Sequence, residues 1–562
     1  MKNLVHNVDF CVIGGGMSGL CAAVAAARKG IKTAIVQDRP VFGGNASGEI
    51  RMWICGAHGK DNRETGIVEE VMLENYYRNP GHKYPVWDTI LHEIAMLEPN
   101  LQVFLNCTCI DAVVEDDTIV SIKGWQLTTE TFHTINAEYF ADCSGDSILA
   151  PLTGAEFMLG RESKTEYNEK IPPDASDKKT MGMSCLIQFR ETATKSKFIP
   201  PSWAYKYTSD DELPDADHSL STNFWWIEVG GCHDSIHDTE ELRDELLKIA
   251  YGVVDHIKNQ GDHGADNWEL EWIGFLPGKR ESRRYKGNYV ITQNHVESGG
   301  YTDDIVAYGG WSMDDHFPEG FYFRNGHPTL YHPAPSPWGI PFGSLYSVNI
   351  KNLLFAGRNI SATHAAMSSS RVMATCALMG QAVGTAVAQL VSDNKPIKDI
   401  DIKRLQQTLL FDDCYIPWVD REISQLTKKA SVNNELIRNG KDRGADNCWV
   451  GKKGDSLMYA FSSPEKLNSI RLIFNSDLNR GYQNMPCSYP LVQTSFKMPE
   501  TMIKEYKLVL SMENGKTEEI VINDNRQRHI LHLVDKTITA VEFIPIKTYG
   551  FEKFNVFSFE LF

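Results

Sequence analysis

The feature that most constrains this 562-residue chain is a glycine pattern between a predicted strand and a predicted helix near its start. Residues 8–13 are mostly apolar and predict a short buried strand, and Gly14, Gly16 and Gly19 follow at the spacing G-x-G-x-x-G. An Ala-rich helix is predicted directly after them. In this setting Gly14 permits a tight turn, Gly16 lets the backbone approach a pyrophosphate, and Gly19 lets helix and strand pack closely. The sequence therefore predicts a dinucleotide site where the helix begins.

The second strand of this unit, predicted over residues 31–36, should end at the ribose. An acidic side chain usually bonds the ribose hydroxyls at that point. Here Gln37 occupies the expected position and Asp38 follows it. Either side chain can bond a hydroxyl, so the choice between them stays open.

Three later glycine-containing segments favour FAD over NAD as the dinucleotide. Residues 43–47 form a second glycine-rich loop, and residues 139–146 predict a strand that runs into a glycine turn. Residues 352–358 predict a further strand that ends at Gly357, before a long helix. The nucleotide fold is therefore expected to be interrupted and then completed much later in the chain.

This arrangement resembles the FAD-binding fold of glutathione reductase and the fumarate reductase flavoproteins, in which a C-terminal segment returns to close over the flavin. Longer motifs make the chain similar to a bacterial family of FAD-dependent oxidoreductases over residues 8–410. These motifs are residues 43–57, 63–67, 280–284, 308–314 and 357–386. The resemblance implies an enzyme with FAD as its cofactor.

The resemblance also implies residues for each part of the cofactor. They are Gly14, Gly16 and Gly19 at the pyrophosphate; Gln37, Asp38 and Arg39 at the adenosine end; Gly44, Asn45, Ser47 and Arg51 near the ribityl chain or flavin ring; Gly145 and Asp146 beside the nucleotide; and Gly357 and Arg358 at the phosphate or ribityl chain. Arg371, with the N-terminus of the helix that follows it, would stabilise the reduced flavin. The alternative for Arg371 is a structural ion pair.

The predicted fold class is α/β, with four segments. A split Rossmann-like FAD-binding domain occupies residues 1–150 and 346–412, and an α+β substrate domain is inserted over residues 151–345. From residue 415 to 562 short alternating strands with turns predict a β-sandwich, which looks like a galactose-binding-like domain. Such a domain either binds glycans or serves only as a packing or dimer surface.

Candidate substrate-binding residues come from the insert. Trp311, Asp314 and His316 combine an aromatic face with polar groups, which is what a sugar ring needs. The alternative is a Pro-rich loop whose aromatic residues are simply core. Arg283, in the charged run 280–284, is a candidate clamp for a carboxylate such as a uronate. A solvated face or an ion-pair network is the alternative for that run.

The leading hypothesis for the chemistry is oxidation of a carbohydrate or related hydroxyl by hydride transfer to flavin N5. A neutral imidazole suits the base that takes the hydroxyl proton. His364, shortly after Gly357, is the first candidate and His332 the second. One alternative is fumarate reductase-like desaturation or reduction of a carboxylate substrate. Another is a glycan-binding protein on a catalytically silent flavin fold. The electron acceptor stays open.

Charge and cysteine usage bound the partners and the compartment. A formal net charge of −17 argues against nucleic acid or an anionic membrane as the main partner. The twelve cysteines contain no CxxC pair, so no metal site is expected, and reduced thiols in a cytoplasmic protein are favoured. The uncharged stretch 372–391 is rich in Ala and predicts a buried helix rather than a membrane span. A homodimer is the default expectation.

Overall fold

The computed structural model describes residues 1–481 and 485–562, which form two compact units. Unit 1 comprises Met1–His58, Gly81–Leu405 and a further segment that ends at Thr494. Unit 2 comprises Gly59–Pro80, Gln406–Gly481 and Ser495–Phe562. The segment 59–80, which sequence reasoning had placed in the first part of the FAD-binding domain, thus belongs with the C-terminal unit.

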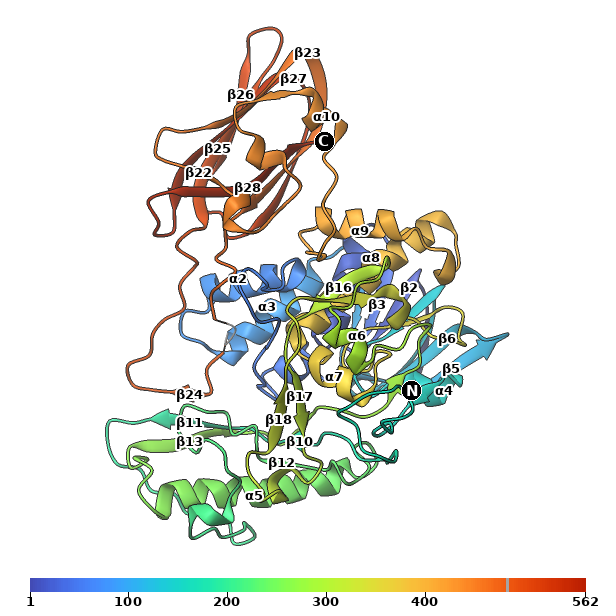
Figure 1. Cartoon of the computed structure of the whole chain (residues 1–562), viewed down its shortest axis with the longest axis vertical. Coiled ribbons are helices and arrows are strands. Elements are labelled where there is room, and N and C mark those ends of the chain that lie inside the picture. The colour runs from blue at the N-terminus through green and yellow to red at the C-terminus, as the bar shows by residue number, and fades with distance from the viewer. Residues whose placement is uncertain (482–484) are drawn as a thin grey trace. The chain divides into compact units, whose positions relative to one another are not determined.

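A five-stranded parallel sheet forms the centre of unit 1, in the order β20-β8-β2-β3-β4. Its strands are β2 (Phe10–Ile13), β3 (Thr33–Val36), β4 (Leu101–Phe104), β8 (Tyr139–Asp142) and β20 (Leu353–Phe355). Figure 1 labels its strands β2 and β3. Every strand except β4 is buried along its whole length, as expected for a parallel sheet covered on both faces. Because β20 pairs with β8, the late strand completes the sheet that the first residues begin, as the sequence predicts.

Two helices with small residues pack together beside this sheet. They are α1 (Met17–Arg28) and α8 (Met373–Asp393). A Cβ atom built on Gly380 would lie 2.0 Å from the Ser18 carbonyl oxygen, and one on Gly384 would lie 2.1 Å from the Ala22 carbonyl oxygen. The contact therefore requires glycine at both positions. In the part of the chain that the structure describes, α8 is the one helix long and apolar enough to cross a membrane, and 94% of its apolar window is buried inside the protein.

A four-stranded sheet of order β1-β7-β6-β5 also belongs to unit 1. Its strands are β1 (Lys2–Asn7), β5 (Cys107–Glu115), β6 (Thr118–Gln126) and β7 (Thr131–Asn136). The strand β1 is mostly exposed and polar, so the apolar pattern that revealed β2 gave no signal for it. Cys107 and Cys109 lie on β5, and all twelve cysteines are free thiols.

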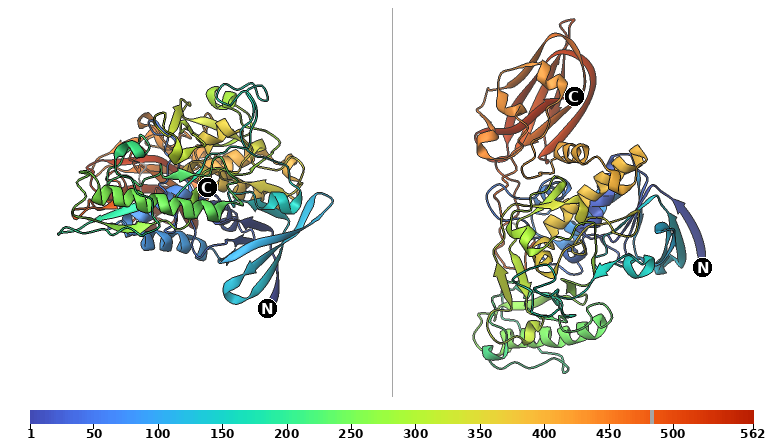
Figure 2. Two further views of the ribbon diagram at one scale, coloured as in Figure 1. Left: turned by 90° about the horizontal axis from the view of Figure 1, so that it is seen from below. Right: turned by 45° about the vertical axis from the view of Figure 1, so that its right-hand side comes forward.

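The insert is built around one long helix, α5 (Thr239–Asn259), as its periodic apolar residues predict. Leu246, Ile249 and Val253 are fully buried against the short strands of the insert. Figure 2 shows α5 as a long green helix that runs alongside those strands. They are β10 (Met183–Ser184), β11 (Ile187–Glu191), β12 (Glu228–Val229), β13 (Trp268–Ile273) and β14 (Gly278–Lys279).

Two hairpin-like strand pairs complete unit 1 near the site described below. The pair β17 (Met313–His316) and β18 (Thr329–His332) is antiparallel, and so is the pair β16 (Ile305–Gly309) and β19 (Trp338–Pro341). A short helix, α7 (His364–Ser370), precedes α8. Another pairing joins β24 (Ser488–Tyr489) to β11 of the insert.

Unit 2 is an antiparallel β-sandwich domain with a helix, α2 (Ile67–Arg78), from the early segment. Its sheet comprises β21 (Ser431–Val432), β22 (Trp449–Gly451), β23 (Leu457–Phe474), β25 (Ile503–Ser511), β26 (Thr517–Ile522), β27 (His529–Thr548) and β28 (Phe554–Leu561). The sequence predicts separate short strands over residues 456–461 and 469–474, where the structure has β23, and over residues 529–533 and 538–544, where it has β27. Register shifts inside the β23–β27 pairing let each long strand continue past the irregular residues.

Candidate active site

One cavity of about 740 Å³ lies at the carboxyl ends of the central parallel strands. Ile13 and Val36, the last residues of β2 and β3, are part of its wall, together with Gly14 and Gly16. Ligands of open parallel sheets bind at this edge, where loops and helix N-termini converge. The cavity extends from there to β17, β18 and the insert. Residues of the parallel sheet, of the β17–β18 pair and of the insert therefore line one space.

The three glycines of the first turn have different surroundings. Gly14 has a φ of +98°, and a Cβ atom there would lie 2.5 Å from the Cys143 carbonyl group. A Cβ atom on Gly19 would lie 1.8 Å from the Gly14 carbonyl oxygen, so this glycine serves the packing of α1 on the turn and does not line the cavity. A Cβ atom on Gly16 would meet nothing closer than Gly44 Cα, at 3.9 Å. Gly16 thus faces an open cradle that any side chain would fill.

The start of α1 is suited to bind a diphosphate. Gly16 is the N-cap residue and supplies no side chain, and the first turn contains no acidic residue. The backbone N–H groups of that turn therefore face the cradle without a side-chain acceptor, and the helix dipole favours negative charge there.

Basic side chains outnumber the single carboxylate beside this cradle. Asp146 accepts hydrogen bonds from Lys279 Nζ at 2.9 Å and from Arg358 Nη2 at 2.8 Å, and Arg283 also lines the cavity. Burial would raise the pKa of Asp146, but Arg358 and Lys279 outweigh burial and hold it well below the ordinary value. Three cations against one carboxylate leave positive charge for the phosphates of a dinucleotide.

The structure distinguishes the two candidates for the ribose. Gln37 Oε1 accepts from the Gly15 N–H at 2.7 Å, and Gln37 Nε2 donates to the Val41 carbonyl at 3.1 Å. Its amide thus holds the glycine loop in place. Asp38 also lines the cavity, and its side chain is 60% exposed, with Arg39 3.7 Å away. Of the two, Asp38 has the exposed carboxylate, which can bond ribose hydroxyls.

The second glycine loop contributes Gly43, Gly44 and Asn45 to the cavity. Asn45 Nδ2 donates to the Lys279 carbonyl at 3.0 Å, which ties this loop to the insert. Ser47 does not line the cavity, but its Oγ atom is buried and has no hydrogen-bond partner among the described residues.

Arg51 was expected near the flavin, and the structure holds its side chain elsewhere. Its Nη1 atom donates to Gln188 Oε1 at 2.7 Å, and its guanidinium lies 4.3 Å from the Trp272 ring and 4.6 Å from the Tyr84 ring. These contacts with aromatic rings and with the insert keep Arg51 outside the cavity wall.

The wall formed by β17 is polar and buried. Asp314 and His316 alternate along β17 and both line the cavity. His316 Nδ1 lies 2.6 Å from Glu228 Oε2, and Asp314 Oδ2 lies 3.1 Å from Arg371 Nη2. Arg280 Nη1 is 3.2 Å from the same Glu228 oxygen. The arginines and carboxylates of this wall are thus paired one to one.

The electrostatics of the wall keep both carboxylates ionised. Burial would raise the pKa of Asp314, but His316 and Arg371 outweigh burial and lower it well below the usual range. Burial would also raise the pKa of Glu228, but Arg280 and His316 outweigh burial and lower it.

Aromatic rings form the rest of the wall. Trp225, Trp311 and Tyr331 line the cavity, and Trp311 stacks on His58 with 4.3 Å between ring centroids. Burial is the main reason that the pKa of Tyr331 rises to about 12, so its hydroxyl stays protonated and can donate a hydrogen bond.

The two histidines proposed as base do not line the cavity. His364 is buried between Glu281 Oε2, 2.8 Å from its Nδ1 atom, and Asp315 Oδ1, 3.0 Å from its Nε2 atom. Burial would lower its pKa, but these two carboxylates raise it to about 10. A ring that is cationic at neutral pH cannot accept a proton, so the geometry disfavours His364 as the base. The other candidate, His332, lies on β18 opposite Met313.

The other predicted residues fall into two groups. Gly145, Gly357, Arg358, Arg371 and Trp311 line the cavity, as do Arg39 and Arg283. Elsewhere in the charged run, Arg284 is buried and bonded to Glu281 and Glu162, which is the ion-pair network given as the alternative. Arg371 is paired with Asp314 and also lines the cavity, so its ion pair does not remove it from the site.

Sequence reasoning missed Glu228, Arg280 and Trp225 as individual site residues. Glu228 lies on the two-residue strand β12 and is more than eighty residues from His316 in the chain. No local motif marks it. The usable signal was the pair of tryptophans at 225 and 226, which is unusual in a polar segment.

Comparison with known proteins supports the same interpretation of the cavity. The model of one protein family, described as FAD dependent oxidoreductase, matches residues 9–409. Among curated proteins, none matches the sequence.

Solved structures that match parts of this chain include reductases and a carbohydrate-binding module. A geranylgeranyl bacteriochlorophyll reductase-like protein from Thermoplasma acidophilum is 12% identical, with 73% of this chain and 86% of that chain covered and a TM-score of 0.34. The FrdA subunit of E. coli quinol fumarate reductase is 12% identical, with 70% and 72% covered and a TM-score of 0.29. The family 32 carbohydrate-binding module of Streptococcus pneumoniae EndoD is 10% identical, with 24% and 94% covered and a TM-score of 0.18.

Proposed function

Because the chain belongs to the FAD-dependent oxidoreductase family and has FAD as its cofactor, we propose that it oxidises a hydroxyl of a neutral carbohydrate or related polyol. The observation that carries this proposal is the composition of the β17 wall. It combines buried, mutually neutralised charges with three aromatic rings in the cavity that also contains the dinucleotide cradle.

The charge pairing favours a neutral substrate. Arg280 is matched by Glu228 and Arg371 by Asp314, so neither guanidinium offers an uncompensated charge to a carboxylate. A buried substrate carboxylate needs a cation of its own, since an unpaired charge in a desolvated site is costly. A hydroxyl-rich substrate needs only donors and acceptors, which these side chains supply.

The aromatic rings favour a sugar ring in particular. Trp225, Trp311 and Tyr331 offer flat apolar faces against which C–H groups pack, while Asp314 and His316 stand beside them as hydrogen-bonding groups. A carbohydrate has both kinds of surface, whereas a purely apolar substrate would leave the buried polar groups of this wall without partners.

When bound, FAD supplies the acceptor for a hydride. The chain itself must take the hydroxyl proton, and His316 is placed to do so. Its Nδ1 atom lies 2.6 Å from Glu228 Oε2, which orients the ring, and in a neutral ring with its proton on Nδ1 the other nitrogen, Nε2, would take the hydroxyl proton. Asp314 Oδ1 lies 3.5 Å from Nε2, so a substrate hydroxyl that bonds to this nitrogen would replace a long contact with that carboxylate. After proton transfer, Glu228 stabilises the imidazolium.

The test is anaerobic mixing of the FAD-loaded protein with a panel of neutral sugars and polyols, the matching uronates, and unsaturated acids. We expect the flavin absorbance to bleach with at least one neutral sugar or polyol, and more slowly or not at all with its uronate. If no sugar or polyol bleaches the flavin, the proposal fails. Tight sugar binding without bleaching would indicate a glycan-binding protein on a silent flavin fold.

A second candidate is reduction of an unsaturated carboxylate. The observation in its favour is that two arginines, Arg280 and Arg371, line one wall of the cavity. Substrate binding would then have to displace Asp314 from Arg371. Reoxidation of the chemically reduced enzyme by an unsaturated acid, but not by keto sugars, would favour this candidate.

A further inference from the structure

A cluster of histidines lies in the insert, away from the cavity described above. Asp210, His218 and His256 each offer one ligand atom, and these atoms all lie within 4.8 Å of one another. His263 adjoins the cluster, and none of the four residues is among the described residues that line the cavity. We infer that Asp210, His218 and His256, with His263 beside them, form a binding site for a zinc-class divalent metal ion.

The spacing of the donor atoms fits a tetrahedral ion. Asp210 Oδ1 lies 2.8 Å from His256 Nε2 and 3.7 Å from His263 Nε2, and the two histidine nitrogens are 3.1 Å apart. Ligands about 2.1 Å from a tetrahedral ion are about 3.4 Å from one another. The observed distances lie on both sides of that value, so small side-chain rotations would centre an ion between them.

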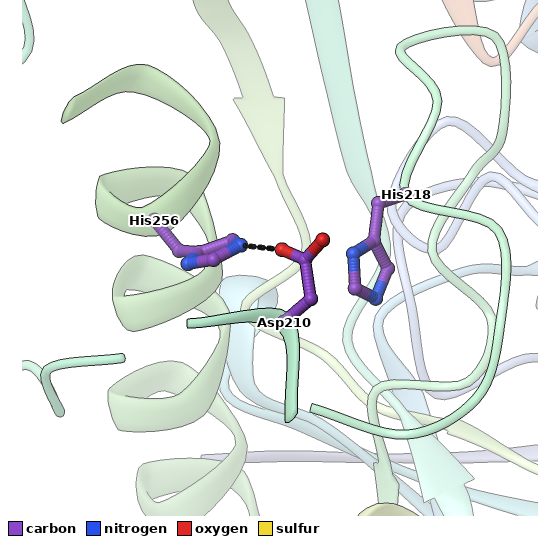
Figure 3. Close-up of side chains that lie close together, drawn as sticks. All are labelled: Asp210, His218 and His256. Carbon is purple, nitrogen blue, oxygen red and sulfur yellow. Dashed lines mark hydrogen bonds and ion pairs between the residues drawn. The ribbon is translucent and has the colours of Figure 1, made fainter. Parts of the chain in front are cut away.

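The arrangement of His218 and His256 places the carboxylate between two imidazoles. Figure 3 shows His256 and His218 on opposite sides of the Asp210 carboxylate. The nitrogen of His218 that faces Asp210 is Nδ1, and Nε2 lies on the far side of the ring (Figure 3).

A second contact orients His256 as metal-bound histidines are usually oriented. Its Nδ1 atom lies 3.3 Å from the Tyr207 carbonyl oxygen, so the Nδ1–H group faces a backbone acceptor. This leaves Nε2, the atom nearest Asp210 and His263, with a lone pair for an ion. Without an ion, two histidine nitrogens and a carboxylate oxygen meet at one point, and their donors and acceptors have to be shared among them.

The ligands come from three segments that an ion would join. His256 lies in the last turns of α5, and His263 follows the end of that helix. Asp210 begins the short helix η3 (Asp210–Glu212), and His218 lies in the loop that leads on to Trp225. Because Trp225 lines the cavity, the ion would fix the loop that supplies one of its aromatic faces.

The donor set identifies the class of metal. Imidazole nitrogens with one carboxylate suit Zn²⁺ and the neighbouring Co²⁺, Ni²⁺ and Cu²⁺, whereas Mg²⁺ and Ca²⁺ prefer oxygen ligands throughout. The sequence carries no local signature, since the ligands are spread over more than fifty residues, and the expectation of no metal rests on the cysteines alone. The Asp210 side chain is 70% exposed, which gives an ion access from solvent.

The test uses the full chain with FAD bound, freed of metal with a chelator and then titrated with Zn²⁺ against a chromophoric competitor. We expect one tightly bound equivalent in the unaltered protein. Asp210→Asn and His263→Ala should each weaken binding at least tenfold. Co²⁺ at the same site should give the intense visible absorption of a four-coordinate ion.

The control is His233→Ala, which removes an exposed histidine of the same insert that lies outside the cluster. It should bind zinc like the unaltered protein. Flavin absorbance and circular dichroism check that each variant is folded, and Asp210→Asn, at an exposed side chain, is the mildest change. The inference is overturned if the unaltered protein takes up no zinc, or if Asp210→Asn and His263→Ala bind it as tightly as His233→Ala does.

Discussion

At the scale of single residues, substituting two glycines of one motif by alanine should have different effects, one on FAD binding and the other on stability. A methyl group on Gly16 would enter the open cradle, so Gly16→Ala should weaken FAD binding at least tenfold, about 1.4 kcal/mol, and leave the FAD-free protein as stable as before. A methyl group on Gly19 would collide with the Gly14 carbonyl, so Gly19→Ala should lower the free energy of unfolding by about 1–3 kcal/mol. FAD titration and thermal unfolding of both variants decide this. Unchanged FAD affinity in Gly16→Ala would contradict the assignment of the cradle.

The buried ion cluster of His364 predicts a pH dependence of stability. Its pKa is raised from 6.5 in the unfolded chain to about 10 in the folded protein by Glu281 and Asp315, against the opposing effect of burial. A raised pKa contributes stability that is complete below about pH 6.5 and is lost as the pH rises toward 10.

We therefore expect the melting temperature to fall over that interval in the unaltered protein. The fall should be smaller in His364→Gln, which has no titratable ring. At pH 6.5 the variant should be destabilised by about 3–5 kcal/mol, since it leaves buried carboxylates without their cation. Equal pH profiles for the two proteins would show that His364 is not the cationic centre of the cluster.

At the scale of elements, the contact between α1 and α8 should tolerate no side chain at its glycines. A Cβ atom on Gly384 would lie 2.1 Å from the Ala22 carbonyl, so Gly384→Ala should force the helices apart and destabilise unit 1 by about 1–3 kcal/mol. Since α1 and α8 both border the cavity at their N-termini, FAD content should fall as well. Ser392→Ala, at an exposed position of α8, is the matched control. Equal melting temperatures for the two variants would count against the packing argument.

Some elements of this fold can be predicted from the sequence and others cannot. The strand–turn–helix around Gly14 and the periodic helix α5 could be predicted, because their signals are local. The two-residue strands β10, β12 and β14 could not, since so few residues carry no periodicity. The same limit applies to the site. Glu228 acquires its contacts with His316 and Arg280 only when three distant segments meet.

At the scale of the whole molecule, the two units are interleaved in sequence. The helix α2 belongs to unit 2, where Leu73 is part of its core and Glu69 bonds to Ser476 and Arg480. The chain returns to unit 1 up to Thr494, where β24 pairs with β11.

We expect a chain truncated after residue 412 to leave Leu73 exposed and to remove the contacts of Glu69 with Ser476 and Arg480. It should therefore be less soluble and contain less FAD than the full chain. A truncated protein with full FAD content and unchanged melting temperature would show instead that a cut at this boundary separates independent domains. The sequence-based boundary near residue 415 treats the C-terminal domain as one continuous segment, whereas unit 2 also includes Gly59–Pro80.

The central claim for the whole molecule is that one cavity combines the FAD cradle with a wall that takes a proton from a neutral hydroxyl through His316. Single-turnover reduction of bound FAD by the most effective sugar, followed in the unaltered protein and in His316→Gln, tests it most directly. His92→Gln, at an exposed histidine of the helix Tyr84–Met96, is the control. The account predicts a rate at least 10²-fold lower in His316→Gln, with FAD content unchanged. Reduction of His316→Gln at the rate of the unaltered protein would contradict it.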